Sequence, residues 1–307
     1  NKPLLFQIII LSFIGLYFFY SASIIYSEKQ FEEPYYYFKR FIIGNLFLPF
    51  LCFIIFSILD WEFIRKITPL LLIVSLLLAS LAFLPQFKLP GQSTSRWLHF
   101  KGFSFQPAEL LKLTTLLFVG FLVPILKKRR KKDYLLLFFA IIFLILFIIF
   151  QQPALANLLI LLSAIIGGLL STKLKNIAFI FILLSLVFIA FSFLWGYRAE
   201  RVKSFLREES FQVNQTRLAI GSGGWLGKGV GKSELKLIGL PLFITDSIFA
   251  VYAEEAGFVG SIFLILLYLS LIFNIFYLGS KNIEDEKRFF IFATGLSLIH
   301  ISEPTRQ

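Results

Sequence analysis

Long stretches without a charged residue recur along the whole of this sequence. Seven of them lie at 3–25, 41–59, 67–84, 134–150, 154–171, 176–195 and 257–279, and an eighth, 108–126, carries only Glu109 and Lys112 as charged residues. A helix needs about 20 apolar residues to cross a bilayer, and it satisfies its own backbone hydrogen bonds there. The pattern predicts an all-α, polytopic integral membrane protein with eight full transmembrane helices.

The composition excludes the common soluble classes. Apolar residues make up 58% of the chain and charged residues only 16%, against about 25% charged residues in an ordinary soluble domain. One cysteine, Cys52, and two histidines provide neither a disulfide framework nor a zinc cluster. The formal net charge of +12 is interpreted as a signal of membrane topology, and no nucleic acid partner is expected.

The C-terminal part of the sequence is treated separately. The apolar stretch 289–302 ends after about 14 residues, too short to cross a bilayer. Residues 296–307 resemble a translated sequencing-library adapter, so we expect them to be non-native. The expectation is a single integral membrane domain over 1–307 that is truncated within a ninth helix.

Basic residues predict the sidedness of the loops. The strongest signal is the run KKRRKK at 127–132, which the positive-inside rule places in the cytoplasm. Alternation then places the N-terminus and the loops 60–66, 172–175 and 281–288 on the cytoplasmic side. The two long loops, 85–107 and 197–246, are predicted to be extracytoplasmic.

Glu109 and Lys112 are the charged residues inside a predicted span. Their spacing of three places them on one helix face, where they can pair. Charges within a span usually face the protein interior and mark a site. A pair that snorkels toward the membrane surface is the alternative, because both residues lie near the outer end.

Two helix starts share a short sequence. Gln106-Pro107 and Gln152-Pro153 each open a predicted span on the outer side, and proline suits the first turn of a helix. Helix N-termini carry unpaired NH groups and a partial positive charge, so two of them together could receive an anionic headgroup. The alternative is that both are ordinary helix starts.

The outer loop 197–246 has a glycine-rich centre, GSGGWLGKGVGKS at 221–233. A nucleotide-binding P-loop would need glycine where Leu226 stands, so we reject that function. What remains is a flexible loop that could bring backbone NH groups, Lys228 and Lys232 close to phosphate. A plain flexible loop explains the glycines equally well.

Acidic residues follow this loop. Asp246 precedes an apolar stretch, where desolvation would raise the pKa of its carboxyl group and suit it to act as a general base. Aspartate at this position could equally be a helix N-cap. The segment 247–279 is longer than a perpendicular span, so we expect its first turns, with Glu254 and Glu255, to lie in an outward vestibule around a break at Gly257.

Taken together in order, these motifs resemble one family. They are YSAS at 20–23, SRWL at 95–98, FQPAELLK at 105–112, AIGSGG at 219–224, LP at 240–241, TD at 245–246, IFAV at 248–251 and EEAGFVG at 254–260, with Gln212 and Gln215 between them. The chain resembles the SEDS family, the FtsW/RodA/SpoVE group of polytopic peptidoglycan glycosyltransferases. The motif around 229–237 is more similar to the cell-division branch than to the elongation branch.

The resemblance implies a fold, an activity and partners. The fold would be a bundle of about ten transmembrane helices, and the activity would be polymerisation of lipid II on the outer face of the cytoplasmic membrane. The partners would be a class B penicillin-binding transpeptidase and other division or elongation proteins. Whether a divalent cation assists stays open.

The resemblance also assigns roles to residues. Asp246 would be the catalytic base that deprotonates the acceptor sugar hydroxyl, with inversion at the anomeric carbon. Arg96 and Lys112 would offset the charge of the departing pyrophosphate, and Glu109 would hold Lys112 in place. The further substrate-binding candidates are Gln212, Lys228 and Lys232, and Glu254 and Glu255 are additional site residues.

The chain departs from the family pattern in places. Leu242 and Ile244 replace an acidic residue and a histidine, and Ala154 replaces an aspartate. Two other functions therefore stay open. A polytopic fold with charges at the outer helix ends could also belong to a transporter of lipid-linked precursors, but a transporter predicts charged residues deep in several spans, and here they cluster at the outer ends of few. A non-catalytic division scaffold would tolerate the lost side chains.

Overall fold

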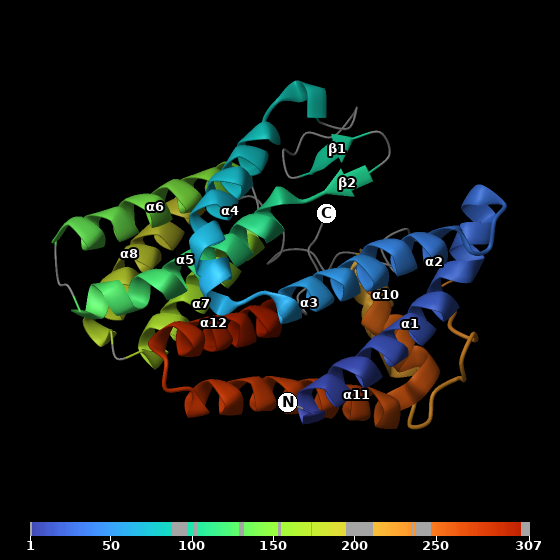
Figure 1. The fold of residues 1–307 in the computed structure, drawn as a ribbon. Helices are drawn as coiled ribbons and strands as arrows, with labels where there is room; N and C mark the ends of the chain where they lie inside the picture. The colour runs from blue at the N-terminus through green and yellow to red at the C-terminus, as the bar shows by residue number, and fades with distance from the viewer. Residues whose placement is uncertain are drawn as a thin grey trace. The chain divides into compact units, whose positions relative to one another are not determined.

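The computed structural model describes residues 2–87, 97–100, 103–128, 132–152, 155–172, 174–194, 211–234, 236 and 247–301. Helices dominate these residues (Figure 1). They are α1 (Lys2–Phe31), α2 (Tyr36–Phe41), η1 (Ile42–Phe47), α3 (Leu48–Ile58), α4 (Trp61–Leu81), η2 (Pro85–Phe87), α5 (Pro107–Lys128), α6 (Lys132–Gln151), α7 (Leu155–Ser171), α8 (Lys175–Leu194), α10 (Phe211–Ser222), α11 (Ile248–Lys281) and α12 (Asp285–Ile301).

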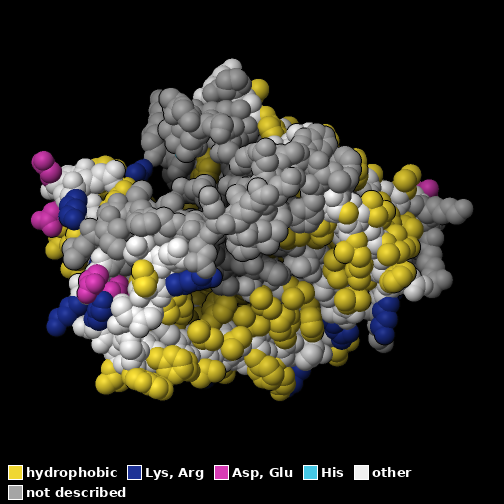
Figure 2. Space-filling model, turned by 180° about the vertical axis from the view of Figure 1, so that it is seen from behind, with side chains coloured by type: hydrophobic (Ala, Val, Ile, Leu, Met, Phe, Trp, Pro, Cys, Tyr) yellow, Lys and Arg dark blue, Asp and Glu magenta, His cyan; other side chains and the backbone are white. Residues whose placement is uncertain are grey.

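The predicted all-α membrane architecture is confirmed. Six helical segments are long and apolar enough to cross a membrane: Lys2–Phe31, Tyr36–Ile58, Trp61–Leu81, Pro107–Lys127, Asp133–Gln151 and Ile248–Lys281. Two shorter apolar helices, Ala156–Ser171 and Lys175–Ala190, coincide with the other two predicted spans. Figure 2 shows hydrophobic side chains covering broad areas of the described surface, as expected where lipid replaces water.

The chain forms two compact units. The first contains Asn1–Ile58 and Ile189–Asn274, and the second contains Leu59–Phe188 and Ile275–Ser302. The charged residues that the sequence singles out are divided between the two units.

The second unit is built around α5, α7 and α12. The ring of Phe289 is fully buried, and it lies against Gly120 of α5 and Gly168 of α7. A Cβ atom on Gly120 would lie 3.3 Å from this ring, and one on Gly168 would lie 2.6 Å from it. The two glycines therefore allow the helices to approach closely, as small residues do in membrane proteins.

Acidic residues at the start of α12 join the ends of two other helices. Asp285 accepts from Lys127 Nζ at 2.5 Å. Glu286 forms an ion pair with Arg65 and accepts from Trp61 Nε1 at 3.1 Å. The start of α4, the end of α5 and the start of α12 therefore lie together, in agreement with the prediction that their loops share one side of the membrane.

The first unit pairs α1 with α11 through amide side chains. Gln7 Nε2 donates to Ser270 Oγ at 2.8 Å, and Asn274 Nδ2 donates to Gln7 Oε1 at 2.8 Å. At the other end of this contact, the buried side chains are Phe19, Ala22, Ala219, Ala250 and Val251. The small side chains bring α1, α10 and α11 together.

A short hairpin in the predicted outer loop 85–107 was missed by the sequence analysis. Strand β1 (Leu98–Phe100) pairs antiparallel with β2 (Phe103–Phe105), with Leu98 opposite Phe105 and Phe100 opposite Phe103. The hairpin runs directly into the Pro107 start of α5, and the side chain of Leu98 is buried. Three-residue strands give too little alternation to be recognised in a sequence.

Candidate functional site

The predicted site residues divide into three sets. Glu109 and Lys112 lie in the second unit, and Lys228, Lys232, Glu254 and Glu255 lie in the first. Gln212 belongs to the first turn of α10. Arg96 and Asp246 lie outside the described residues, as do Ala154, Leu242 and Ile244.

Lys112 is a buried cation. Its side chain is only 8% exposed, and Nζ lies 2.9 Å from Glu109 Oε2. It also donates to Asn157 Oδ1 at 3.2 Å. The predicted pairing of Glu109 with Lys112 is confirmed. The snorkelling alternative is wrong for Lys112, because its ammonium group lies inside the unit, whereas the Glu109 side chain is 48% exposed.

The contact from Lys112 to Asn157 joins two helix starts. Lys112 lies in the second turn of α5, and Asn157 lies in the first turn of α7. The first turns of these helices are therefore close together. The Lys112–Glu109 pair therefore lies beside two helix N-termini, whose unpaired NH groups and partial positive charge can receive an anionic ligand.

Neighbouring polar contacts join α5 and the residue that follows α6 to α4. Ser75 Oγ and Thr114 Oγ1 are 2.8 Å apart and join α4 to α5. Gln152 Nε2 donates to the carbonyl oxygen of Ala79 at 3.0 Å. The Ser75–Thr114 contact holds α5 against α4, so the position of Lys112 does not depend on Glu109 alone.

Asn157 was missed by the sequence analysis. Its side chain is buried and holds the ammonium group of Lys112. The available signal was an amide residue inside the apolar run 154–171, shortly after Pro153. Because its partner is far away in sequence, no local spacing rule connects the two residues.

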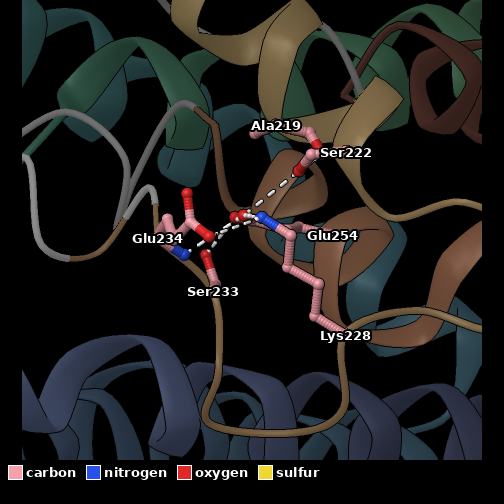
Figure 3. A network of polar contacts seen from close by, with 6 residues as sticks. All are labelled: Ala219, Ser222, Lys228, Ser233, Glu234 and Glu254. Carbon is pink, nitrogen blue, oxygen red and sulfur yellow. Dashed lines mark hydrogen bonds and ion pairs between the residues drawn. The ribbon is translucent and has the colours of Figure 1, made fainter.

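Glu254 is the centre of a hydrogen-bonded network in the first unit (Figure 3). Its Oε1 accepts from Lys228 Nζ at 2.8 Å and from Ser222 Oγ at 3.2 Å. The same oxygen accepts from the Glu234 backbone NH at 3.1 Å, and Oε2 accepts from Ser233 Oγ at 2.5 Å. This carboxylate joins the end of α10, the glycine-rich loop and α11.

Lys228 is held by two carboxylates. Its hydrogen bond to Glu254 is the main cause of its raised pKa, and a second bond to Glu234 at 3.0 Å adds to the effect. A raised pKa means that the stabilising contact is fully present below the ordinary lysine pKa of about 10.4 and is lost only as the pH rises further. Lys228 therefore stays charged and paired at neutral pH.

Glu255 forms a second, separate network. It makes an ion pair with Lys236, and neither side chain is exposed. Ser21 of α1 bridges the pair: its Oγ accepts from Lys236 Nζ at 2.7 Å and donates to Glu255 Oε2 at 3.1 Å. The adjacent residues Glu254 and Glu255 of α11 thus bind one lysine each. Glu254 binds Lys228, which precedes Ser233 in the sequence, and Glu255 binds Lys236, which follows it.

The expected vestibule is wrong for these two glutamates. The side chains of Glu254 and Glu255 are 2% and 0% exposed, and both are engaged by lysine and serine donors. Lys232, by contrast, is exposed. Within the described parts of the chain, no group of three or more His, Cys, Asp or Glu side chains could hold a metal ion.

The predicted break in α11 is confirmed. Gly257 has φ 70° and ψ −168°, far from helical values. In a regular helix the NH groups of Phe258 and Val259 would bond to the carbonyls of Glu254 and Glu255. Because the chain turns at Gly257, all four of these backbone groups need other partners.

The glycine-rich loop supplies all four partners. Phe258 NH donates to Gly224 O at 2.9 Å, and Val259 NH donates to Trp225 O at 3.1 Å. In the opposite sense, the NH of Lys228 donates to the Glu254 carbonyl at 2.9 Å. The NH of Gly229 donates to the Glu255 carbonyl at 3.1 Å. The loop is inserted into the hydrogen-bond ladder of α11.

This insertion corrects the interpretation of the glycines. The NH groups of Lys228 and Gly229 are bonded to α11 carbonyls, so they do not form a phosphate cradle. Glycine is needed because the backbones nearly touch: a Cβ atom on Gly227 would lie 2.1 Å from the Glu255 carbonyl oxygen. A Cβ on Gly257 would lie 2.2 Å from the nitrogen of Gly227. The loop is docked rather than freely flexible over 223–234.

Replacing Gly227 with alanine is expected to undock the loop. The clash with the Glu255 carbonyl adds to a backbone strain of about 1–3 kcal/mol for a side chain at positive φ. Gly231→Ala is the matched control, because φ is +84° there against +81° at Gly227, with nothing within 4 Å of the added Cβ. Limited proteolysis should cut the loop faster in Gly227→Ala than in Gly231→Ala. Equal rates would mean that the close contact does not hold the loop.

Comparison with known proteins gives consistent results. The family model described as "Cell cycle protein", for the FtsW, RodA and SpoVE proteins, matches residues 2–303. A relative from Wigglesworthia glossinidia brevipalpis, named "Probable peptidoglycan glycosyltransferase FtsW", is 31% identical over 94% of this chain and 78% of its own. A protein of the same name from Haemophilus influenzae is 29% identical over 96% of this chain and 77% of its own.

Solved structures share the fold. A chain of a peptidoglycan synthase complex matches with a TM-score of 0.72 and 21% identity, over 97% of this chain and 83% of that one. The rod shape determining protein RodA of Thermus thermophilus matches with a TM-score of 0.64 and 22% identity, over 97% of this chain and 81% of that one. With the family match over nearly the whole length, the chain belongs to the FtsW/RodA/SpoVE family of cell cycle proteins and is a multi-pass membrane protein.

Proposed function

We propose that the chain is a peptidoglycan glycosyltransferase that polymerises lipid II at the outer face of the cytoplasmic membrane. The names of its relatives support this activity. The single structural observation that carries the proposal is Lys112, a buried cation at the adjoining N-terminal turns of α5 and α7. That arrangement suits the pyrophosphate of a lipid-linked sugar donor.

The proposed chemistry is one displacement at the anomeric carbon. The acceptor sugar 4-hydroxyl attacks this carbon, a new C–O bond forms, and the bond to the undecaprenyl pyrophosphate breaks with inversion. Asp246 takes the hydroxyl proton as general base. Lys112 and Arg96 offset the negative charge that accumulates on the leaving pyrophosphate.

The described residues on either side of the segment that contains Asp246 are held in place within the first unit. The segment 237–246 follows Lys236, which is fixed by Glu255 and Ser21. It precedes Ser247, whose Oγ accepts from Thr216 Oγ1 at 3.3 Å, and α11 begins at Ile248. Lys228 and Lys232 are weaker candidates for substrate contact, since Lys228 is already bound to Glu254.

Topology and partners complete the proposal. The N-terminus would be cytoplasmic and the loop 197–246 extracytoplasmic, following the basic run at 127–132. One structural neighbour is part of a peptidoglycan synthase complex. By analogy, a class B penicillin-binding transpeptidase would bind this chain during division or elongation.

The test is glycan polymerisation from lipid II in liposomes that contain the chain and its transpeptidase. Wild type is compared with Asp246→Asn, which keeps the shape of the side chain and removes the base. Glycan ladders that are lost in the variant support the polymerase and its base. Equal ladders would remove Asp246 from the mechanism. Folded proteins that both fail to make ladders would favour a precursor transporter or a scaffold.

A further inference from the structure

The docked loop carries exposed apolar side chains at the break of α11. Trp225 is 73% exposed and Leu226 is 82% exposed, which is unfavourable for such side chains in water. Both residues are nevertheless held in place, because the carbonyl of Trp225 accepts from Val259 and Leu226 lies between the bonded residues 225 and 227. Their exposure is therefore a fixed property of the docked loop.

These two side chains continue an apolar stripe on α11. Beyond the break, Phe258, Ile262, Leu266, Leu269 and Phe273 are all exposed, at spacings of three or four residues that define one helix face. This part of α11 is a membrane span, so an exposed apolar stripe on it is suited to lipid.

Trp225 is joined to the first residue of this stripe. Its ring packs edge-on against Phe258, with the ring centroids 5.1 Å apart and an interplanar angle of 80°. The loop therefore adds tryptophan and leucine side chains at the level where the span begins. Tryptophan is enriched at this depth in membranes, where an apolar ring and a polar NH group are both satisfied.

The loop also carries polar side chains. Lys228, Ser233 and Glu234 are bound to Glu254 (Figure 3), and Lys232 is exposed. The loop thus combines exposed apolar side chains with charged side chains, as interfacial segments do.

We propose that residues 224–230 form a membrane-interface anchor, with Trp225 and Leu226 inserted at the boundary between headgroups and acyl chains. The occupant of this surface is lipid, because the surface continues the stripe of a transmembrane helix. The anchor fixes the depth of the loop in the leaflet, and through its four backbone bonds it fixes the start of the α11 span at the same depth.

Spin labels can measure this depth in the full chain in liposomes. The native Cys52 is replaced by serine, and a single cysteine is introduced by Leu226→Cys and labelled with a nitroxide. Lys232→Cys is the matched control on the same loop, and Leu266→Cys is the lipid-facing reference in the middle of the span. Collision rates with oxygen, which concentrates in lipid, are compared with those of a water-soluble nickel complex.

The expected result is that the label at 226 collides more with oxygen than with the nickel complex, as at 266, whereas the label at 232 shows the reverse. A label at 226 that behaves like the one at 232 would place the loop in water and overturn the proposal. Protection from both reagents would also overturn it, because a protein surface would then cover the loop. Quenching of Trp225 by brominated lipids, with Trp61, Trp97 and Trp195 replaced by phenylalanine, gives a second measurement with position 226 unchanged.

Discussion

Replacing Lys236 with methionine is expected to destabilise the first unit by about 3–5 kcal/mol. The substitution keeps the length of the side chain but leaves the Glu255 carboxylate buried without its cation, and neither side chain of the pair is exposed. Ser21 provides one hydrogen bond, which cannot balance the desolvation of a full charge. The measurement is the free energy of unfolding of the chain in detergent micelles.

Two variants show whether the stranded charge is the cause. Lys232→Met removes an exposed lysine from the same loop and should change the stability by no more than about 0.5 kcal/mol. The double variant Lys236→Met/Glu255→Gln removes both charges, and it should recover most of the loss because no buried charge stays unpaired. Lys236→Met could prove as stable as Lys232→Met, or the double variant could prove no more stable than Lys236→Met. Either result would show that an unpaired charge on Glu255 is not the cause of the destabilisation.

The features that the sequence predicted correctly depend on local rules. The long apolar runs predicted the spans because a bilayer imposes both a length and a hydropathy on each helix. The pairing of Glu109 with Lys112 follows from a spacing of three on one helix. The break at Gly257 follows from a segment longer than one span that contains a glycine. Each of these inferences needs only residues that are neighbours in sequence.

The features that were missed depend on residues far apart in sequence. Lys236 and Ser21 are separated by most of the chain, yet they meet at Glu255. Asn157 of α7 bonds to Lys112 of α5, 45 residues earlier in the sequence. The docking of the glycine-rich loop was missed for the same reason. Its composition suggested flexibility, but its backbone groups are bonded to α11. A glycine can provide either a flexible backbone or room for another backbone to pack closely against it. The sequence does not distinguish the two, because the segment that packs against the glycine is far away in the chain.

Lys112→Met is expected to have a different signature from Lys236→Met: a large loss of activity with a smaller loss of stability. Under the proposed mechanism, removing one preorganised positive group from the leaving pyrophosphate should slow polymerisation by about 100–1,000-fold. Stability should fall less than in Lys236→Met. The remaining carboxylate, Glu109, has a side chain that is 48% exposed and can be hydrated, so the loss is limited to about 1–3 kcal/mol for the buried Asn157 Oδ1 that loses its donor.

Lys175→Met is the matched control for this effect. Lys175 is an exposed lysine at the start of α8 in the same unit, so its removal lowers the net charge equally without touching the cluster. Polymerisation rates from lipid II should stay near the wild-type value in the control and fall in Lys112→Met.

The polymerisation rate of Asn157→Ala should lie between those of Lys175→Met and Lys112→Met, because the ammonium group would stay present but lose the contact that fixes its position. Wild-type rates in folded Lys112→Met would show that this cation has no part in the reaction. A variant that unfolds would show that the lysine serves the packing of α5 against α7.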